Sequence, residues 1–319
     1  MYRIVLFLSI WIITSCDDDG SVTKKDPTQF YEYQVLPQDT DAGIASSPDF
    51  HYAYLDTRVV SRGKLLVFLS GTDSHPKDYQ LFSQTAASLG YHVVNLNYVN
   101  SEPVSRCFSD EDEACFSQFH EEVIFGSPES EFVNIDSTNS IYNRTIALLS
   151  YLHQQYPRQE WEQFYNSSAL HYEKLVLAGH SQGGGHAAYF AKKFSINRLI
   201  VFAAPNDYSE KYDRPAAWCQ SDFATSPTRF FGMLHKRDEI VSTSYQYAIW
   251  NAIKLLSTAD TTSADGSAFT TSHALVTNYE PNPGATHRLR HNVPVRDDAV
   301  PAGSEGEHLK TVWKYLLGN

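Results

Sequence analysis

Beyond residue 50, short apolar runs alternate along the chain with segments in which apolar residues recur every three or four positions. The runs at 64–69 (KLLVFL), 91–96 (YHVVNL) and 175–178 (LVLA) are continuous, which is typical of strands that are buried on both faces. Strand-like composition also covers 50–60, 198–203, 228–234 and 273–279. These segments predict a sheet built from several buried strands.

The intervening segments have the spacing of helices that bury one face. Gly90 and Pro157 favour helix ends at their positions. Strands and helices that alternate with short connections predict an α/β fold, in which one mostly parallel sheet carries helices on both faces. The sequence contains no internal repeat, and we predict a single domain over 31–319. The predicted helices are 79–89, 137–156, 184–194, 245–256 and 309–317.

The first residues have the pattern of a targeting segment. Arg3 precedes the run 4–13 (IVLFLSIWII), which is about half the ~20 residues that a membrane-spanning helix needs and fits the core of a signal peptide. Residues 13–16 (ITSC) then resemble the lipobox of bacterial lipoproteins. This resemblance implies that 1–15 is removed and that Cys16 is acylated, so that the protein is exported and anchored at the periplasmic or outer face of a bacterial membrane.

An ordinary signal peptide, cut after Ser15, is the alternative to lipidation. In either case the acidic and polar composition of 16–30, which begins with three aspartates after Cys16, predicts a flexible tether. No later run approaches the length of a membrane-spanning helix.

Three more cysteines follow Cys16. An exported protein meets an oxidising environment, in which disulfides persist. Cys107 and Cys115 lie eight positions apart in 100–136, an acidic insertion without clear periodicity that is long enough for a lid. We therefore predict a disulfide between them and leave Cys219 as a buried or free thiol. The chain contains no C-x-x-C pair, which argues against a zinc site.

Composition excludes one large class of function. The 319 residues include 37 Asp and Glu against 25 Lys and Arg, which gives a formal net charge of −12. Such a chain repels nucleic-acid phosphates, and no basic run offsets that repulsion. With 42% hydrophobic and 19% charged residues, the composition is that of a globular protein rather than a disordered one.

The strand predicted at 175–178 is followed by 179–183 (GHSQG), a G-x-S-x-G sequence, and then by a glycine-rich helix start. A serine at the apex of so tight a turn needs small neighbours, and the turn exposes its hydroxyl beside a helix N-terminus that favours developing negative charge. In this context the sequence resembles the α/β-hydrolase superfamily, and its serine esterases and lipases in particular, from about residue 50 onward. The resemblance implies that Ser181 is a nucleophile.

Two other interpretations of this segment are weaker. Residues 183–188 (GGGHAA) match a relaxed dinucleotide-binding pattern, with Asp207 near the position of a ribose-binding acid. However, the first glycine of a nucleotide fold closes the strand, whereas GHSQ separates Gly183 from the strand here. In the second interpretation, Ser181 only caps the N-terminus of the following helix and has no chemical role. We therefore predict no cofactor.

A serine nucleophile needs a base, and the base needs an acid that orients it. The order along the chain in the superfamily is Ser, then Asp or Glu, then His. Asp238 follows the strand predicted at 228–234, where the resemblance implies the acid. Glu239 and Asp207 are the alternatives.

Four histidines follow Asp238 in the sequence. His273 opens the last predicted strand and so lies at the wrong end of the sheet, and His308 belongs to the final helix. His287 and His291 lie in the loop after that strand, where the resemblance implies the base. We prefer His291, with His287 and then His308 as alternatives. A metal site at His287 and His291 is disfavoured, because neither an H-E-x-x-H sequence nor a third ligand is near.

Acyl transfer also requires N–H groups that hold the oxyanion. The resemblance implies the backbone N–H of Gln182, directly after the nucleophile, and a second one from the loop after the first buried strand. We nominate Thr72, in 70–74 (SGTDS), for the second.

Together these features predict a monomeric serine hydrolase that cleaves a carboxylic ester through an acyl-enzyme on Ser181. The ester belongs to a small molecule, a glycan or a lipid. The alternatives are a lipase, thioesterase or peptidase of the same fold, or a hydrolase-like surface protein that binds without catalysis.

Overall fold

The computed structural model describes residues 27–166, 169–256, 261–266 and 269–318. The predicted signal peptide (1–15), Cys16 and most of the predicted tether lie outside these ranges. Within them, no helix is both long and apolar enough to cross a bilayer.

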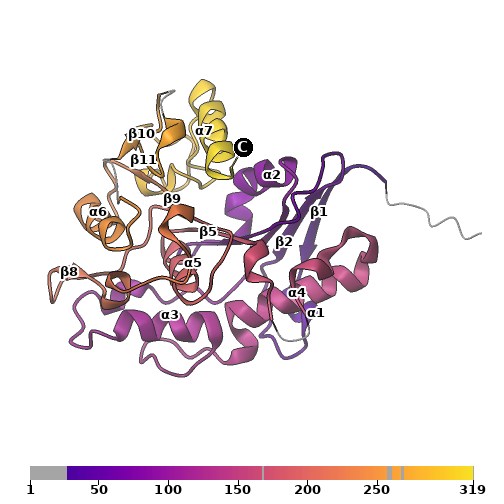
Figure 1. Ribbon diagram of the computed structural model, residues 1–319, viewed down its shortest axis with the longest axis horizontal. Coiled ribbons are helices and arrows are strands. Elements are labelled where there is room, and N and C mark those ends of the chain that lie inside the picture. Colours follow the sequence, from indigo (N-terminus) through magenta and orange to yellow (C-terminus); the bar gives the residue numbers. More distant parts are fainter. Residues whose placement is uncertain (1–26, 167–168, 257–260, 267–268, 319) are drawn as a thin grey trace, which may run out of the picture.

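A nine-stranded sheet forms the centre of the described chain (Figure 1). Its strands lie side by side in the order β1-β2-β4-β3-β5-β6-β9-β11-β10. β2 is antiparallel to both of its neighbours, and every other neighbouring pair is parallel. The predicted α/β class with a mostly parallel sheet is therefore confirmed. The strands of the sheet are β1 (Phe30–Val35), β2 (His51–Asp56), β3 (Leu65–Leu69), β4 (His92–Leu96), β5 (Leu175–His180), β6 (Arg198–Phe202), β9 (Phe230–His235), β10 (Thr262–Ser263) and β11 (Ala274–Thr277).

The central strands are buried on both faces. In β3, Leu65, Val67 and Leu69 join the hydrophobic cluster on one face of the sheet, and Leu66 and Phe68 join the cluster on the other. All five side chains are at most 2% exposed. Because successive side chains of a strand point to opposite faces, a strand covered on both sides must be apolar throughout, as Leu65–Leu69 is.

Helices cover both faces of the sheet (Figure 1). α2 and α7 pack together on one face, where the rings of Phe82 and Trp313 meet edge-on with their centroids 5.8 Å apart. α3, α4, α5 and α6 contribute to the hydrophobic cluster on the other face. The helices are α1 (Pro37–Thr40), α2 (Gln80–Ser88), α3 (Cys115–Phe125), α4 (Ile141–Gln155), α5 (Gln182–Lys193), α6 (Thr243–Ala252) and α7 (Ser304–Leu316), and β7 (Tyr208–Ser209) and β8 (Arg214–Pro215) form a separate hairpin.

The edge strand β1 is absent from the sequence-based prediction. It begins at Phe30, the last residue of the range predicted as a tether, so that range is one residue too long. The strand is half-buried and rich in tyrosine, and the ring of Tyr33 stacks on that of Tyr156 with centroids 4.1 Å apart. An edge strand of this kind lacks the continuous apolar run that marks the central strands.

The helix α3 is also absent from the prediction, because 100–136 shows no clear periodicity. Two polar side chains interrupt its apolar face: His120 and Glu122 are buried together with Phe119. The Glu122 carboxylate accepts the backbone N–H groups of Ser130 and Ile135, at 2.8 and 2.9 Å, and so holds the following loop. The helix α3 is therefore part of the core rather than a covering over it.

The Cys107 and Cys115 sulfur atoms are joined in a disulfide, with the two Cα atoms 5.6 Å apart. The bond connects the start of α3 to the short turn at Val104–Cys107. Cys219 is a free thiol, and it is fully buried.

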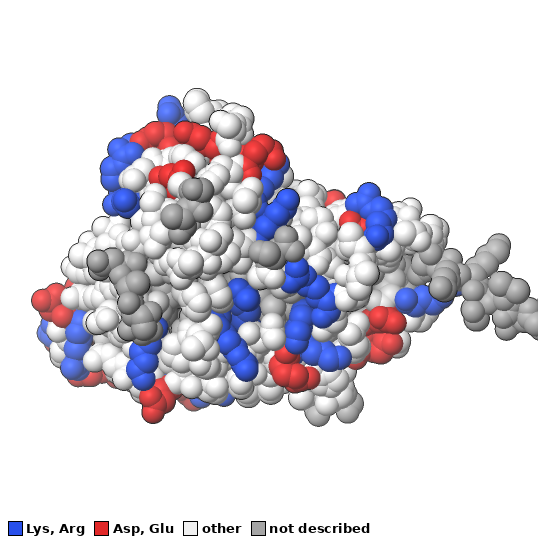
Figure 2. Space-filling model, turned by 45° about the horizontal axis from the view of Figure 1, so that its top comes forward, with Lys and Arg blue, Asp and Glu red and all other residues white. Residues whose placement is uncertain are grey.

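Charged side chains of both signs occur on the outside of the molecule. On the face shown in Figure 2, Lys and Arg lie mainly along the middle, and uncharged surface separates many of the charged groups. Some basic groups rest on aromatic rings: the Arg198 guanidinium lies 4.1 Å from the ring centroid of Phe231, and that of Arg62 lies 5.2 Å from Tyr91. These cations contribute to packing through cation–π contacts.

Candidate active site

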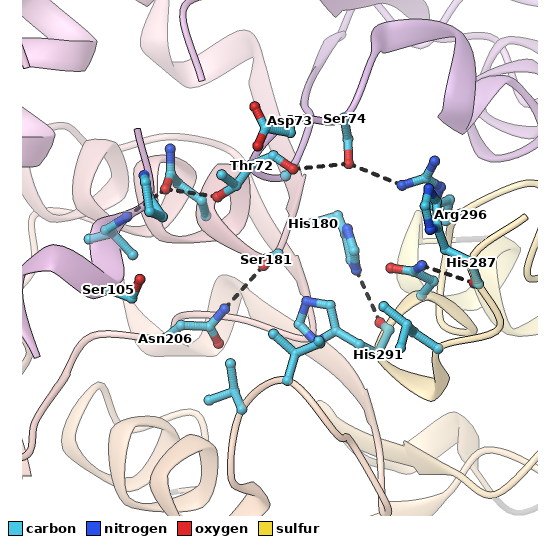
Figure 3. Close-up of a pocket in the computed structure, with 18 of the residues that line it drawn as sticks. Thr72, Asp73, Ser74, Ser105, His180, Ser181, Asn206, His287, His291 and Arg296 are labelled. Atoms are coloured by element: carbon cyan, nitrogen blue, oxygen red, sulfur yellow. Dashed lines mark hydrogen bonds between the residues drawn. The ribbon is translucent and has the colours of Figure 1, made fainter. Parts of the chain in front are cut away.

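The loops at the carboxyl ends of the parallel strands surround a cavity of about 620 Å³. The chain runs from β3 to β4 on one side of β3 and later returns to place β5 on the other side. At such a switch point neighbouring loops diverge, and open α/β sheets bind their ligands in the crevice between them. Ser181 directly follows β5 at this point and lines the cavity (Figure 3).

Ser181 has a strained backbone conformation, with φ 52° and ψ −126°, at the turn from β5 into α5. For a residue other than glycine such a conformation costs on the order of 1–3 kcal/mol, so the surroundings must hold it in place. The flanking glycines allow this. A Cβ atom on Gly179 would lie 2.4 Å from the backbone of Gly183, and one on Gly183 would lie 2.2 Å from the carbonyl oxygen of Leu69. The turn is therefore tight enough to lift the serine hydroxyl into the cavity.

Replacing Gly183 by alanine is expected to lower the free energy of unfolding by about 1–3 kcal/mol, the usual cost of overpacking. The added methyl group would meet the carbonyl oxygens of Leu69 and Ser70, which belong to the end of a central strand. Gly284→Ala is the matched control, because its Cβ would meet only Asn282 Oδ1, at 3.5 Å. Urea unfolding followed by circular dichroism measures both variants, and equal stabilities would contradict the close packing of this turn.

Asp238 and His291 form a buried hydrogen-bonded pair. His291 Nδ1 lies 2.6 Å from Asp238 Oδ2, and the two side chains are 5% and 0% exposed. Asp238 follows β9, and its Oδ1 accepts the backbone N–H groups of Ile240 and Val241, at 2.8 and 3.0 Å. The side-chain amide of Gln246 donates to Oδ2 at 3.1 Å. The carboxylate is thus surrounded by donors, which suits its ionised form.

The Asp238 carboxylate orients the imidazole of His291. Burial raises the pKa of Asp238, but the hydrogen bond and charge interaction with His291, together with the N–H groups of Val241 and Ile240, outweigh it and leave that pKa below its usual value. The ionised carboxylate accepts a hydrogen bond from the N–H at Nδ1 of the neutral imidazole, whose lone pair then lies on Nε2. That Nε2 atom has no hydrogen-bond partner among the described residues. It is available as a general base.

The Ser181 hydroxyl is held by a neighbouring amide. Its Oγ lies 3.2 Å from the side chain of Asn206, in the loop after β6. When that amide is turned so that its nitrogen donates to the carbonyls of Ala203 and Pro205, its oxygen accepts the Ser181 hydroxyl. His291 lines the same cavity, but its Nε2 atom is buried and forms no hydrogen bond to Ser181. Bonds of this kind often tighten only when a substrate binds, and here the hydroxyl would rotate from Asn206 to His291.

The backbone N–H groups of Thr72 and Gln182 donate no hydrogen bond to another described residue, and both residues line the cavity. The Gln182 side chain fixes the loops around them. Its Oε1 accepts the Thr72 hydroxyl at 3.0 Å and the Val104 N–H at 2.7 Å, and its Nε2 donates to the Glu102 carbonyl at 3.0 Å. The loops after β3 and β4 are thereby attached to the start of α5, next to Ser181.

A buried chain of hydrogen bonds connects the Thr72 loop to His291. The Gly71 backbone N–H donates a hydrogen bond to Tyr79 Oη, with the nitrogen and oxygen 3.4 Å apart. The same Tyr79 oxygen lies 3.0 Å from His180 Nδ1. His180 Nε2 lies 3.0 Å from the carbonyl oxygen of His291 (Figure 3). Burial and then the charge of His291 lower the pKa of His180 to about 3, so its ring is neutral. It therefore donates from Nε2 and accepts the Tyr79 hydroxyl at Nδ1.

The other predicted candidates occupy different positions. His287 lines the cavity, but Asp238 is bonded to His291 and not to His287. His308, on α7, lies 2.7 Å from the carbonyl oxygen of Ala264 and is not among the residues that line the cavity. Glu239 accepts the backbone N–H of His291, at 3.2 Å. Of these residues only His291 has the buried carboxylate partner that orients a base.

Asp207 belongs to a second buried cluster, which the sequence-based interpretation misses. His120 Nε2 lies 2.6 Å from Asp207 Oδ1, and His120 Nδ1 lies 2.8 Å from His186 Nδ1. All three side chains are 0% exposed, and Trp218 donates to the same carboxylate oxygen at 3.3 Å. The cluster connects α3 and α5 to the loop that carries Asn206. No spacing motif marks these residues; the only signal is a histidine within the buried face of each of two helices.

Across the described ranges, no group of three or more His, Cys, Asp and Glu side chains is arranged to hold a metal ion. The glycines of the dinucleotide-like pattern, Gly183 and Gly185, lie inside α5. No family model matches the chain, and no curated protein is significantly similar to it in sequence. The chemistry of the site is therefore inferred from its geometry.

Proposed function

We propose that the protein is a serine hydrolase of the α/β-hydrolase fold that cleaves carboxylic esters through an acyl-enzyme on Ser181. One observation carries the proposal. A serine on a strained strand-to-helix turn opens into a cavity that is also lined by His291, whose Nδ1 is bonded to the buried Asp238. The nucleophile Ser181, the orienting acid Asp238 and the base His291 follow one another along the chain in that order, as in the superfamily that the sequence resembles.

In the proposed reaction Ser181 Oγ attacks the ester carbonyl carbon while His291 Nε2 takes the hydroxyl proton. The carbonyl oxygen becomes an oxyanion that accepts the N–H groups of Thr72 and Gln182. When the bond to the alcohol oxygen breaks, the imidazolium returns the proton to that oxygen, and the acyl group stays on Ser181. A water molecule that His291 deprotonates then attacks the acyl-enzyme. As the bond to Ser181 Oγ breaks, the imidazolium returns that proton to the serine oxygen, and the carboxylic acid leaves. Asp238 keeps the imidazole in the required tautomer throughout.

Labelling with a fluorophosphonate tests this proposal, because the reagent requires an activated serine. The protein is incubated with the probe and digested, and the modified peptide is identified by mass spectrometry, while hydrolysis of p-nitrophenyl acetate is followed in parallel. We expect modification at Ser181 with loss of the esterase activity. A protein that neither reacts with the probe nor turns over the ester would overturn the proposal.

Tyr79→Phe is expected to lower kcat by about tenfold with a smaller change in KM, because loss of the hydroxyl frees His180 and, through it, the backbone of His291. Tyr91→Phe is the matched control. Its buried hydroxyl donates to the main-chain oxygen of Leu317, at 2.6 Å, and that partner does not line the cavity. Both variants lose about 1 kcal/mol of stability, and only the first loses activity. Equal activities would show that Tyr79 has only a structural role.

We also propose that Cys16 is lipidated and anchors the exported protein to a membrane. The support is the resemblance of 13–16 to a lipobox after a short apolar run. Cell fractionation and incorporation of labelled palmitate, for the wild type and Cys16→Ala, test it. A variant that stays in the membrane fraction, or a wild type without label, would contradict the anchor.

A further inference from the structure

Two walls of different chemistry flank the cavity around Ser181, which Ile240 and Val241 also line. The 103–108 wall, formed by Pro103, Val104, Ser105 and Phe108, is mainly apolar. We call the second wall the polar wall. It combines the loop after β3 with the segment that carries His291, and its one apolar residue is Leu289. Figure 3 shows Ser105 and Asn206 on one side of Ser181 and His287 and Arg296 on the other. The polar wall consists of Asp73, Ser74, His75, His287, Leu289, Asn292 and Arg296.

The proposed reaction determines which part of an ester meets which wall. The leaving alcohol oxygen must receive its proton from His291 Nε2, so the alcohol lies on the side of His291. His287, Asn292 and Arg296 belong to the same segment as His291 and line that side. The carbonyl oxygen points to the N–H groups of Thr72 and Gln182. The acyl group takes the remaining direction, toward the 103–108 wall.

The 103–108 wall is held from several sides, which limits the length of the acyl group. The Val104 N–H is bonded to the Gln182 side chain at 2.7 Å, and the disulfide fixes Cys107. The carbonyl of Phe108 accepts the backbone N–H groups of Glu210 and Lys211, at 2.8 and 3.3 Å. A wall with so many attachments does not move aside for a long chain, because displacing it would break these bonds.

The charges of the polar wall indicate a neutral alcohol. The Arg296 guanidinium lies 3.3 Å from Asp78 and 3.1 Å from Asp298, and it also donates to the Ser74 hydroxyl at 3.2 Å. Its charge is therefore already compensated and does not favour an anionic ligand. The exposed Asp73 carboxylate repels anions but accepts hydrogen bonds from hydroxyl groups. Carboxylate, imidazole and amide groups around one side of the cavity can bind several hydroxyls at once.

We propose that the substrate is an ester of a short acyl group, such as acetyl, with a neutral alcohol rich in hydroxyl groups, such as a sugar. The inference rests on the proposed serine-hydrolase function. The short acyl group lies against the 103–108 wall, with Phe108 at its end, and the hydroxyl groups of the alcohol bind along the polar wall, with Asp73 as an acceptor.

Two matched pairs of substrates test the inference on the wild-type protein. The first pair is p-nitrophenyl acetate and p-nitrophenyl octanoate, which differ only in the acyl chain. The second pair is a methyl glucoside acetylated on its primary hydroxyl and hexyl acetate, which carry the same acyl group on a hydroxyl-rich and on an apolar alcohol. We expect kcat/KM to favour the acetate in the first pair and the glucoside ester in the second, each by at least about tenfold. A preference for octanoate or for hexyl acetate, or no preference in either pair, would overturn the inference.

Two variants assign these preferences to the walls. Phe108→Ala is expected to shift the octanoate-to-acetate ratio of kcat/KM upward by about tenfold, because it opens the acyl side. Asp73→Asn is expected to reduce the ratio of the glucoside ester to hexyl acetate by a similar factor. Asp222→Asn, whose side chain is fully exposed and outside the cavity lining, is the control and leaves both ratios unchanged. Unshifted ratios in both wall variants would contradict the assignment.

The outcomes separate this inference from the function on which it rests. A protein that reacts with the fluorophosphonate at Ser181 but prefers long acyl chains or apolar alcohols is a serine hydrolase with a different substrate. A protein that neither reacts with the probe nor hydrolyses p-nitrophenyl acetate is not the proposed serine hydrolase, and the inference about its substrate then fails together with that function.

Discussion

Ser181→Ala is expected to lower kcat/KM for p-nitrophenyl acetate by at least about 10⁴-fold, because no covalent intermediate can form without the hydroxyl. The methyl side chain of alanine fits the turn, and the φ of 52° at this position is no worse for alanine than for serine. The fold should therefore survive. A change in kcat/KM with an unchanged circular dichroism spectrum would assign the effect to chemistry.

Ser88→Ala is the control for this variant. Its hydroxyl donates to the carbonyl of Thr85 at the end of α2, away from the cavity lining, so its activity should match that of the wild type. Residual hydrolysis by Ser181→Ala is also informative. Because the N–H groups of Thr72 and Gln182 would remain, a rate slightly above that of the buffer is expected. A Ser181→Ala variant with wild-type turnover would exclude the acyl-enzyme on this residue.

The turn at Ser181 and the central sheet could be predicted because their residue choices are dictated by backbone geometry. A Cβ atom on Gly179 or Gly183 would clash with backbone atoms, so glycine is strongly favoured at both positions. β3 is covered on both faces, so its run must be apolar. Constraints of this type act on a few neighbouring residues and are visible in a short window of sequence.

The remainder of the site depends on contacts between residues that are far apart in the chain. Which histidine meets Asp238 is decided by the path of the loop after β11, and no local pattern distinguishes His287 from His291. Asn206 is bonded to Ser181 only because β6 lies next to β5. α3 escapes prediction for the same reason, since the partners of its buried His120 come from α5 and from the loop after β6.

Asp238→Asn is expected to lower kcat by about 10⁴-fold while the fold is kept, because the substitution reverses the tautomer of His291. In the wild type, Oδ1 accepts hydrogen bonds from the backbone N–H groups of Ile240 and Val241, and Oδ2 accepts a hydrogen bond from the Nδ1–H of His291. An asparagine must place its oxygen toward the two backbone donors, which turns its NH₂ group toward His291. The imidazole then accepts at Nδ1 and carries its proton on Nε2, where it cannot take a proton from Ser181.

The pH dependence of stability provides a second measurement on the same variant. The pKa of Asp238 is lowered in the folded protein, so its charge adds stability above the unfolded pKa and loses that contribution as the pH falls through the folded value. The wild type should thus exceed Asp238→Asn in free energy of unfolding above about pH 5, and the difference should shrink below about pH 4.

Asp56→Asn, which breaks the ion pair with Arg58 outside the cavity lining, should show a similar pH dependence with unchanged activity. If Asp238→Asn instead retained activity, the carboxylate would be a structural group and the tautomer of His291 would be set by other neighbours.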